Sequence, residues 1–336
     1  MRRAEWRKAS IDAGLERDVH ILSVDGGGYL GLATAAFVEG IEHHFGSLVA
    51  DRFDFFCGTS TGAIIALGLA VGKSGAELRE LYTKLGERAL RPSPGRGSKP
   101  ARLFWPKYDL EPLRDALSDA FGDMTLRDVL GRGKKVLATS FCLTTGQPRF
   151  FKTNHSAGLT QHDGYRIVDV ALASAAAPVY FPLVTIRHPV FGTEETFCDG
   201  GVVTNQPALV AYAEALSELA IAPRDVRLLS LSTPRADLRS PDPIVTRRGL
   251  RHWGWGEQLA ATFIEGGAQM SGEALKRIIR CYPEAERPCY ERIELQNRHR
   301  LEFDDSSPRA TQALVVEGSS LASSNEIRGR VEVFFR

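Results

Sequence analysis

The sequence predicts an α/β fold: a three-layer sandwich in which helices cover both faces of a mostly parallel central sheet. Two observations lead to this prediction. Short apolar runs typical of strands alternate with segments of helical periodicity, a pattern that favours parallel sheets. Residues 63–71 are apolar nearly all round, as expected for a helix buried against the sheet. We expect one domain over residues 1–336, with a catalytic core of about 18–235 and a helical extension of about 236–336 packed on it.

The predicted strands are apolar runs bounded by turn residues, and the predicted helices carry apolar residues at spacings of three and four. Strands are expected at 18–24, 53–57, 134–143, 148–152, 196–198, 226–232 and 290–295. Helices are expected at 32–45, 63–71, 78–85, 110–121, 168–177, 205–219, 257–280 and 311–335. Ser74 and Glu77 have capping-box spacing before the third helix, and Pro178 ends the fifth.

The composition is that of a soluble globular protein, with 43% hydrophobic and 25% charged residues. A formal net charge of +1 gives no global field that would select a nucleic-acid polymer as a partner. The five cysteines are scattered and odd in number, which favours buried free thiols in a reducing compartment. The charged N-terminus lacks the apolar segment of a secretion signal, and no apolar run approaches the roughly 20 residues of a membrane span. We therefore expect a cytoplasmic protein that touches membranes only peripherally.

Residues 53–62 have the pattern of a nucleophile elbow, the sharp turn between a strand and a helix that presents a reactive side chain. The apolar run 53–57 leads into Gly58-Thr59-Ser60-Thr61-Gly62, and the apolar helix follows directly. The two glycines permit a tight turn without a Cβ clash, and Ser60 is left at the positive end of the helix dipole. A Gly-x-Ser-x-Gly sequence also occurs in ordinary turns, but the flanking strand and helix favour Ser60 as a nucleophile.

A glycine-rich loop, Gly26-Gly27-Gly28-Tyr29-Leu30-Gly31, follows the first predicted strand. Its spacing also matches the dinucleotide-binding fingerprint, but that fold needs a next strand that ends in an acid for the ribose. Here the next strand leads to Ser60, so we set a nucleotide-binding oxidoreductase aside. Consecutive glycine N–H groups can form a nest for an anion, which beside a nucleophile is an oxyanion hole. We expect the backbone of Gly26, Gly27, Gly28 and Tyr29 to provide it; the alternative is a turn that only needs positive φ.

A nucleophilic serine needs a general base, and histidine is the usual one. None of the eight histidines stands where a strand ends in a sharp turn. His155 and His162 lie in a predicted loop and remain alternatives as the base of a triad.

Asp199 is a stronger candidate for the base because it stands at the end of the short strand 196–198. Gly200 and Gly201 follow it and let the backbone approach a neighbour closely. An aspartate within hydrogen-bond reach of Ser60 could accept its proton directly, provided that its surroundings raise its pKa. The competing interpretation is a common Asp-Gly turn between strands.

Residues 91–106 differ in composition from the rest of the chain because they are rich in proline and glycine and read as a loop. From Arg88 to Lys107 there are six basic residues and no acid, and Leu103-Phe104-Trp105 lies among them. Basic residues beside exposed bulky apolar ones suit an anionic lipid surface. The alternative is a solvated insertion whose aromatic side chains pack back on the core.

Together, the glycine loop, Gly58-Thr59-Ser60-Thr61-Gly62 and Asp199-Gly200-Gly201 occur in the order and context of the patatin-like phospholipases. The resemblance covers about residues 21–212 and implies a patatin-like fold and a Ser–Asp dyad without histidine. It implies a phospholipase A type of lipid acyl hydrolase, with Ser60 as nucleophile and Asp199 as base. An acyl-enzyme would form and water would release the fatty acid. Leu30 stands where the family usually has Arg or Lys, which removes a cation from the oxyanion loop.

A narrower resemblance is to patatin-like effectors of bacterial antiphage systems, carried by 150–155, the chain length and the C-terminal region. It implies activation by a cyclic dinucleotide and degradation of the membrane, with Lys152 and His155 as contacts for a messenger phosphate. The alternative for these two residues is a solvated hairpin end. Assembly into a homo-oligomer is left open by the sequence.

No metal or other cofactor is expected, because no cluster of His, Cys and acidic residues has ligand spacing. Two alternative functions remain beside the phospholipase. One is a constitutive soluble esterase or thioesterase with the same dyad. The other is a nucleotide-sensing protein with a residual hydrolase site, which the presence of Ser60, Asp199 and the glycine loop together disfavours.

Overall fold

The computed structural model describes residues 18–92, 104–155, 161–235 and 257–336. The strands within these ranges are β1 (Val19–Val24), β2 (Phe55–Thr59), β3 (Lys135–Cys142), β4 (Gln147–Lys152), β5 (Val184–Arg187), β6 (Glu194–Asp199), β7 (Val226–Leu231) and β8 (Cys289–Ile293). The helices are α2 (Gly31–Phe45), α3 (Val49–Arg52), α4 (Thr61–Ala70), α5 (Gly75–Arg88), α6 (Glu111–Phe121), α7 (Leu126–Gly131), α8 (Ile167–Ala175), α9 (Ala208–Ser217), α10 (Glu257–Arg280), α11 (Pro308–Ala322) and α12 (Asn325–Val331). Five 3-10 turns in the same ranges span Gly28–Leu30, Gly200–Val202, Pro223–Asp225, Glu284–Glu286 and Glu332–Phe334.

The strands form a single mixed sheet in the order β5-β6-β3-β2-β1-β7-β8, with β4 paired to β3. Strands β3, β2, β1, β7 and β8 run parallel to their neighbours in this row. Strands β4, β5 and β6 add antiparallel pairs at the β3 side. The expected fold class, a mostly parallel sheet in an α/β sandwich, is confirmed.

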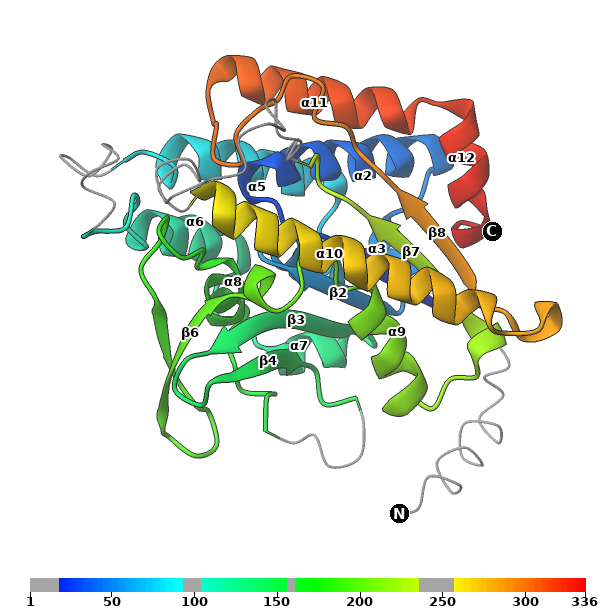
Figure 1. Ribbon diagram of the computed structural model, residues 1–336, viewed down its shortest axis with the longest axis horizontal. Coiled ribbons are helices and arrows are strands. Elements are labelled where there is room, and N and C mark those ends of the chain that lie inside the picture. The colour runs from blue at the N-terminus through cyan, green and yellow to red at the C-terminus, as the bar shows by residue number, and fades with distance from the viewer. Residues whose placement is uncertain (1–17, 93–103, 156–160, 236–256) are drawn as a thin grey trace, which may run out of the picture.

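Apolar side chains on the two faces of the sheet belong to two separate cores, as the alternation of strand residues requires. Leu22 and Val24 of β1 pack into the larger core with α2, α4, α5 and α8, whereas Ile21 packs into the smaller core with α9 and α10. Figure 1 shows α10 crossing in front of the strands, with α2 and α11 along the top of the view. The three layers are therefore helices, sheet and helices.

Strand β3 brings the ends of two other strands together. Its edge next to β2 pairs Thr139 with Thr59, the last residue of β2. One residue further on, Ser140 pairs with Asp199, the last residue of the antiparallel strand β6. Because β4 occupies the opposite edge of β3, β2 and β6 meet end to end along the same edge. The residues that follow β2 and end β6 therefore lie side by side, although 139 positions separate Ser60 from Asp199.

The C-terminal residues that we expected as a packed helical extension also complete the sheet. Strand β8 pairs in parallel with β7 and forms the edge of the sheet. Helix α11 runs along α2, and the two approach so closely that a Cβ on Gly318 would overlap the carbonyl oxygen of Ala33. The C-terminal region is thus part of both the sheet and one helical layer.

Candidate active site

Ser60 lies in a strained turn between β2 and α4. Its φ of 54° and ψ of −123° are rare for a residue with a Cβ, and such strain persists only where the surrounding structure enforces it. A Cβ on Gly58 would overlap the backbone of Gly62, so the turn requires both glycines. The Ser60 N–H donates to Ser174 Oγ at 2.9 Å, and this bond to α8 fixes the turn from the other side. The predicted nucleophile-elbow geometry is therefore present.

Asp199 accepts a hydrogen bond from Ser60 Oγ at 2.6 Å through Oδ2. Its other oxygen, Oδ1, accepts from the Gly201 N–H at 2.6 Å, which fixes the rotamer of the carboxylate. Burial raises the pKa of Asp199 to about 6, although these two hydrogen bonds lower it in part. A carboxylate with this pKa is ionised at neutral pH and still basic enough to accept a proton.

The alternative triad with a histidine base has no geometric support in the described part of the chain. His155 Nδ1 is 2.8 Å from Thr153 Oγ1, and its Nε2 is 2.9 Å from Glu214 Oε1. His162 Nδ1 accepts from the Lys152 N–H at 3.4 Å. Among the described residues, no histidine is hydrogen-bonded to Ser60 or Asp199, so the dyad is the better description of the site.

The glycine loop lies beside Ser60, but only part of it is available to bind an oxyanion. The Gly26 N–H donates to the carbonyl of Asn205 at 3.0 Å, and the Tyr29 N–H donates to the carbonyl of Phe303 at 2.7 Å. The N–H groups of Gly27 and Gly28 have no partner among the described residues. The expectation that all four residues contribute donors is therefore corrected to two, because carbonyls from distant segments occupy the others.

Residues of the C-terminal half hold this loop, and the sequence analysis did not identify them. Thr233 and Asn205 both donate to the carbonyl of Gly26, and the Phe303 carbonyl accepts from Tyr29. Thr233 lies two residues after the end of β7, at the same carboxyl edge of the sheet as Ser60. Its place after a predicted buried strand is a signal that could have identified it; Phe303 lies in an irregular segment that carries no such signal.

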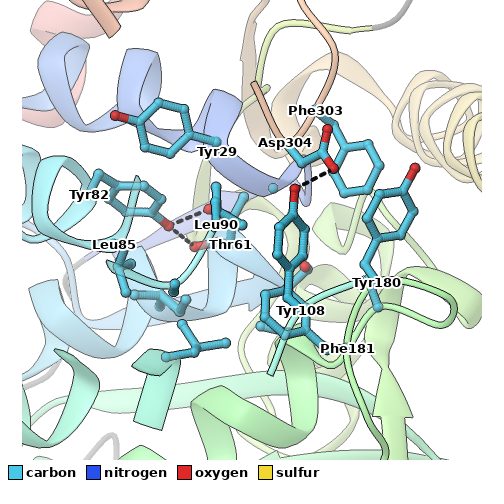
Figure 2. Close-up of a pocket in the computed structure, with 17 residues that line it drawn as sticks. Tyr29, Thr61, Tyr82, Leu85, Leu90, Tyr108, Tyr180, Phe181, Phe303 and Asp304 are labelled. Atoms are coloured by element: carbon cyan, nitrogen blue, oxygen red, sulfur yellow. Dashed lines mark hydrogen bonds between the residues drawn. The ribbon is translucent and has the colours of Figure 1, made fainter. Parts of the chain in front are cut away.

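An apolar pocket opens at Ser60 and runs between α4, α5 and α6 (Figure 2). Its wall is formed by side chains from six segments of the chain: Tyr29, Ile64, Tyr82, Leu85, Leu90, Leu113, Tyr108, Tyr180, Phe181 and Phe303. The Tyr82 hydroxyl donates to the Thr61 carbonyl at 2.7 Å, so its polar tip is satisfied and its ring faces the pocket. The pocket can accept an apolar chain whose end group lies at Ser60.

Three loops meet beside this pocket. Asp304 Oδ2 accepts from the Tyr108 hydroxyl at 2.9 Å (Figure 2). The same oxygen accepts from Lys107 Nζ at 2.6 Å. The rings of Phe303 and Tyr180 pack edge to face, with centroids 4.3 Å apart. Since both carboxylate and ammonium are mostly buried, this contact ties the segments around 107, 180 and 304 together.

Lys152 and His155, which we considered as activator contacts, lie in an internal network. Glu214 Oε1 accepts from Lys152 Nζ at 2.6 Å and is 2.9 Å from His155 Nε2. The His155 side chain is 0% exposed, so the alternative of a solvated hairpin end is wrong for this residue. Both side chains are bound to the α9 carboxylate, and their role as activator contacts stays a prediction.

The Leu30 side chain is buried in the larger core, so an apolar contact occupies the position of the family's cation. No group of three or more His, Cys, Asp or Glu in the described ranges converges as a metal ion would require. No described helix has both the length and the apolar character needed to cross a membrane.

Comparisons with known proteins agree with this site. The family model for patatin-like phospholipase matches residues 22–212, which contain the glycine loop, Ser60 and Asp199. The chain therefore belongs to the patatin-like phospholipase family, and the expected enzyme class, a lipid acyl hydrolase, is confirmed at the level of the family.

Three curated relatives are each named as a cGAMP-activated phospholipase. The one from Pseudomonas aeruginosa is 39% identical over 221 residues, which cover 64% of this chain and 62% of the relative. The one from Escherichia coli is 31% identical over 325 residues, which cover 91% and 89% of the two chains. The one from Vibrio cholerae is 32% identical over 284 residues, 78% of each chain.

Proposed function

We propose that this chain releases fatty acids from membrane glycerophospholipids, with Ser60 as nucleophile and Asp199 as general base, and that a cyclic dinucleotide activates it. The observation that carries the proposal is the 2.6 Å hydrogen bond from Ser60 Oγ to Asp199 in a strained elbow beside an apolar pocket. A strained, buried nucleophile paired with a base of raised pKa is typical of a catalytic site.

In the first step, Asp199 accepts the Ser60 proton while Oγ attacks the ester carbonyl. The carbonyl oxygen becomes an oxyanion, which the free N–H groups of Gly27 and Gly28 are available to bind. The intermediate collapses when the protonated Asp199 returns the proton to the departing lysophospholipid alkoxide. The products of this half-reaction are a lysophospholipid and an acyl ester on Ser60.

In the second step, Asp199 accepts a proton from water, and the resulting hydroxide attacks the acyl carbonyl. A second oxyanion forms and collapses, the fatty acid leaves, and the proton returns to Ser60 Oγ. Because Asp199 returns to its ionised form in each half-reaction, the dyad needs no third member.

The apolar pocket beside Ser60 fits the acyl chain of a lipid, and the surface beside it fits the membrane that supplies the lipid. Phe104 is 79% exposed and Trp105 59% exposed, and the two residues shortly precede Tyr108, which lines the pocket. Val179, whose carbonyl accepts from the Lys107 N–H at 3.0 Å, is also exposed. These side chains would enter the interfacial region of the bilayer, where aromatic residues are favoured.

Activation by a cyclic dinucleotide rests on the relatives, whose names include this property. The closed arrangement of Lys107, Tyr108 and Asp304 beside the pocket is compatible with an enzyme that is restrained at rest. The second candidate is an esterase that is active without any messenger, and the apolar pocket is equally compatible with it.

The test is fatty-acid release from phosphatidylethanolamine and phosphatidylglycerol vesicles by the full chain and by Ser60→Ala, with and without cGAMP. We expect release only with cGAMP and only from the wild type. Release without cGAMP would support the constitutive enzyme and overturn the activation. Equal release by Ser60→Ala would overturn the assignment of the nucleophile.

A matched pair of variants tests the membrane contact. Phe104→Ser with Trp105→Ser should reduce hydrolysis of vesicles by about tenfold, because binding to the bilayer loses buried apolar area. Hydrolysis of a soluble p-nitrophenyl ester should be unchanged, since neither residue lines the pocket. An equal loss on both substrates would contradict a role in membrane contact.

A further inference from the structure

The peptide group that joins Gly26 to Gly27 is held by its carbonyl oxygen. Thr233 Oγ1 donates to this oxygen at 2.5 Å, and Asn205 Nδ2 donates to it at 3.3 Å. The Gly26 N–H donates in turn to the Asn205 carbonyl at 3.0 Å. The first peptide of the glycine loop is thus fixed by two segments that lie far from it in the sequence.

Holding this carbonyl also sets the direction of the Gly27 N–H. A trans peptide is planar, so its C=O and N–H point in opposite directions, and the described residues contain no cis peptide bond. The Gly27 N–H belongs to the same peptide as the Gly26 carbonyl and has no partner among the described residues. Thr233 and Asn205 together therefore determine where this free donor points, and Thr233 makes the shorter of the two bonds.

The Gly28 N–H is also oriented through the carbonyl of its own peptide, but by a hydrogen bond from within the loop. The Gly27 carbonyl accepts from the Leu30 N–H at 3.2 Å, which orients the Gly28 N–H of the same peptide. The two free donors of the loop thus differ in what orients them. The Gly28 N–H depends on the 3-10 turn that follows it, whereas the Gly27 N–H depends on the Thr233 side chain.

Thr233 is well suited to this task because it is itself rigid. Its side chain is buried, and a Cβ on Gly27 would overlap its hydroxyl, so it lies directly against the loop. The preceding residue, Ser232, donates from its N–H to the Ile293 carbonyl of β8 at 3.0 Å and accepts from Thr34 Oγ1 at 3.0 Å. Arg235, two residues after Thr233, forms an ion pair with Glu265 of α10 at 3.0 Å.

We propose that Thr233 is a positioning residue for the reaction, and that its hydroxyl aims the Gly27 N–H at the developing oxyanion. It does not touch the substrate, and it lies outside residues 22–212 that the family model matches. The inference rests on the proposed function, because it assigns a role to the same site. Its consequence is that the C-terminal region of the chain contributes to transition-state stabilisation.

The experiment compares Thr233→Ala with Thr233→Ser, which differ from each other by one hydroxyl. Thr83→Ala and Thr83→Ser are the matched control, since the Thr83 hydroxyl also donates to a backbone carbonyl, that of Arg79 at 3.0 Å within α5, and Thr83 does not line the pocket. The full chain of each variant, with cGAMP, is assayed for kcat and KM on a soluble p-nitrophenyl ester, beside Ser60→Ala. Thermal unfolding is measured for all of them.

We expect Thr233→Ala to lower kcat by roughly tenfold or more, because one misdirected donor weakens binding of the transition state only. KM should stay within about twofold, and Thr233→Ser should restore kcat. The Thr83 variants should leave kcat near wild type.

Unchanged kcat in Thr233→Ala would overturn the inference, and so would an equal loss in Thr233→Ser. A comparable loss in Thr83→Ala would also overturn it, because general loosening would then explain the effect. If the wild type itself shows no hydrolysis that depends on Ser60, the proposed function fails first and the inference fails with it.

Discussion

Ser60 Oγ and Asp199 Oδ2 lie 2.6 Å apart because β2 and β6 meet end to end along one edge of β3. The hydrogen bond is direct, and both side chains are almost fully buried. This relationship makes the protonation state of Asp199 decisive for the chemistry and for the stability of the fold.

The rate of hydrolysis should depend on a single group with a pKa near 6. Asp199 has to be ionised to accept the Ser60 proton, and its burial raises its pKa to about 6. We expect kcat/KM on a soluble ester to fall about tenfold per pH unit below this value and to be level above it. Asp199→Asn should remove the activity over the whole range. A level profile down to pH 5 would contradict Asp199 as the base, as would an active Asp199→Asn enzyme.

The same carboxylate should lower the stability of the protein at neutral pH. Its pKa in the folded state is raised above the ordinary value of 3.8, so the folded state favours the protonated form. Protonation of Asp199 therefore stabilises the folded state. This stabilisation is fully present below the pKa that Asp199 has in the unfolded chain, and it is lost as the pH rises through about 6. Asp199→Asn, which cannot ionise, should therefore be more stable than the wild type at pH 8, by on the order of 1–3 kcal/mol.

This difference should disappear toward pH 4, where Asp199 is protonated in the folded protein. Chemical denaturation of both proteins at the two pH values measures it. A difference that is constant with pH would show that the amide changes stability for another reason.

Loss of Arg292 should destabilise the protein strongly, because the buried carboxylate of Asp25 would lose two hydrogen bonds and keep only the ion pair with Arg235 at 3.6 Å. Arg292 donates to Asp25 through both terminal nitrogens and to Ser230 Oγ at 2.6 Å. Arg292→Met should lower the free energy of unfolding by about 3–5 kcal/mol. Arg298, whose side chain is exposed where it pairs with Glu317, is the control, and Arg298→Met should cost less than about 1 kcal/mol. Similar losses in both variants would contradict the argument from burial.

The contact of Lys107 with Asp304 should behave as a coupled pair. Lys107→Met and Asp304→Asn should each cost about 1–3 kcal/mol of stability, because each leaves the other charge mostly buried without its opposite charge. The double variant should cost less than the sum of the two, which denaturant unfolding of the full cycle measures. Strict additivity would show that the two side chains do not interact.

Glu214 should matter for stability and not for the response to the messenger. It binds both Lys152 and His155, so Glu214→Gln should lower the unfolding temperature. The concentration of cGAMP that gives half-maximal activation should stay unchanged in Lys152→Met. If that concentration rises about tenfold while the unfolding temperature is constant, Lys152 contacts the messenger and our placement of it is wrong.

The parts of the site that depend on local sequence were predictable. The run of strand, glycine turn and apolar helix around Ser60 specifies the elbow by itself, because steric limits in a tight turn are local. Asp199 was predictable as a strand-end acid, and the family resemblance supplied its pairing with Ser60. The register on β3 that joins them depends on contacts across the sheet, which no local pattern contains.

The parts that depend on distant contacts were not predictable. The glycine loop indicated four possible N–H donors for the oxyanion. Those of Gly26 and Tyr29 are excluded because they already donate to the carbonyls of Asn205 and Phe303, which lie far away in the sequence. Thr233 reaches the loop across 207 positions of the chain, so its role appears only in three dimensions. The burial of His155 has the same origin, since Glu214 comes from a helix 59 positions further along.

The most direct test of the central claim is covalent labelling with a fluorophosphonate, followed by peptide mapping by mass spectrometry. Our account predicts one adduct on Ser60 in the wild type, none in Ser60→Ala, and labelling of Asp199→Asn slowed at least about a hundredfold. An adduct on another serine would contradict the account, and so would rapid labelling of Ser60 in Asp199→Asn. Either result would show that the Ser60–Asp199 pair is not the catalytic dyad.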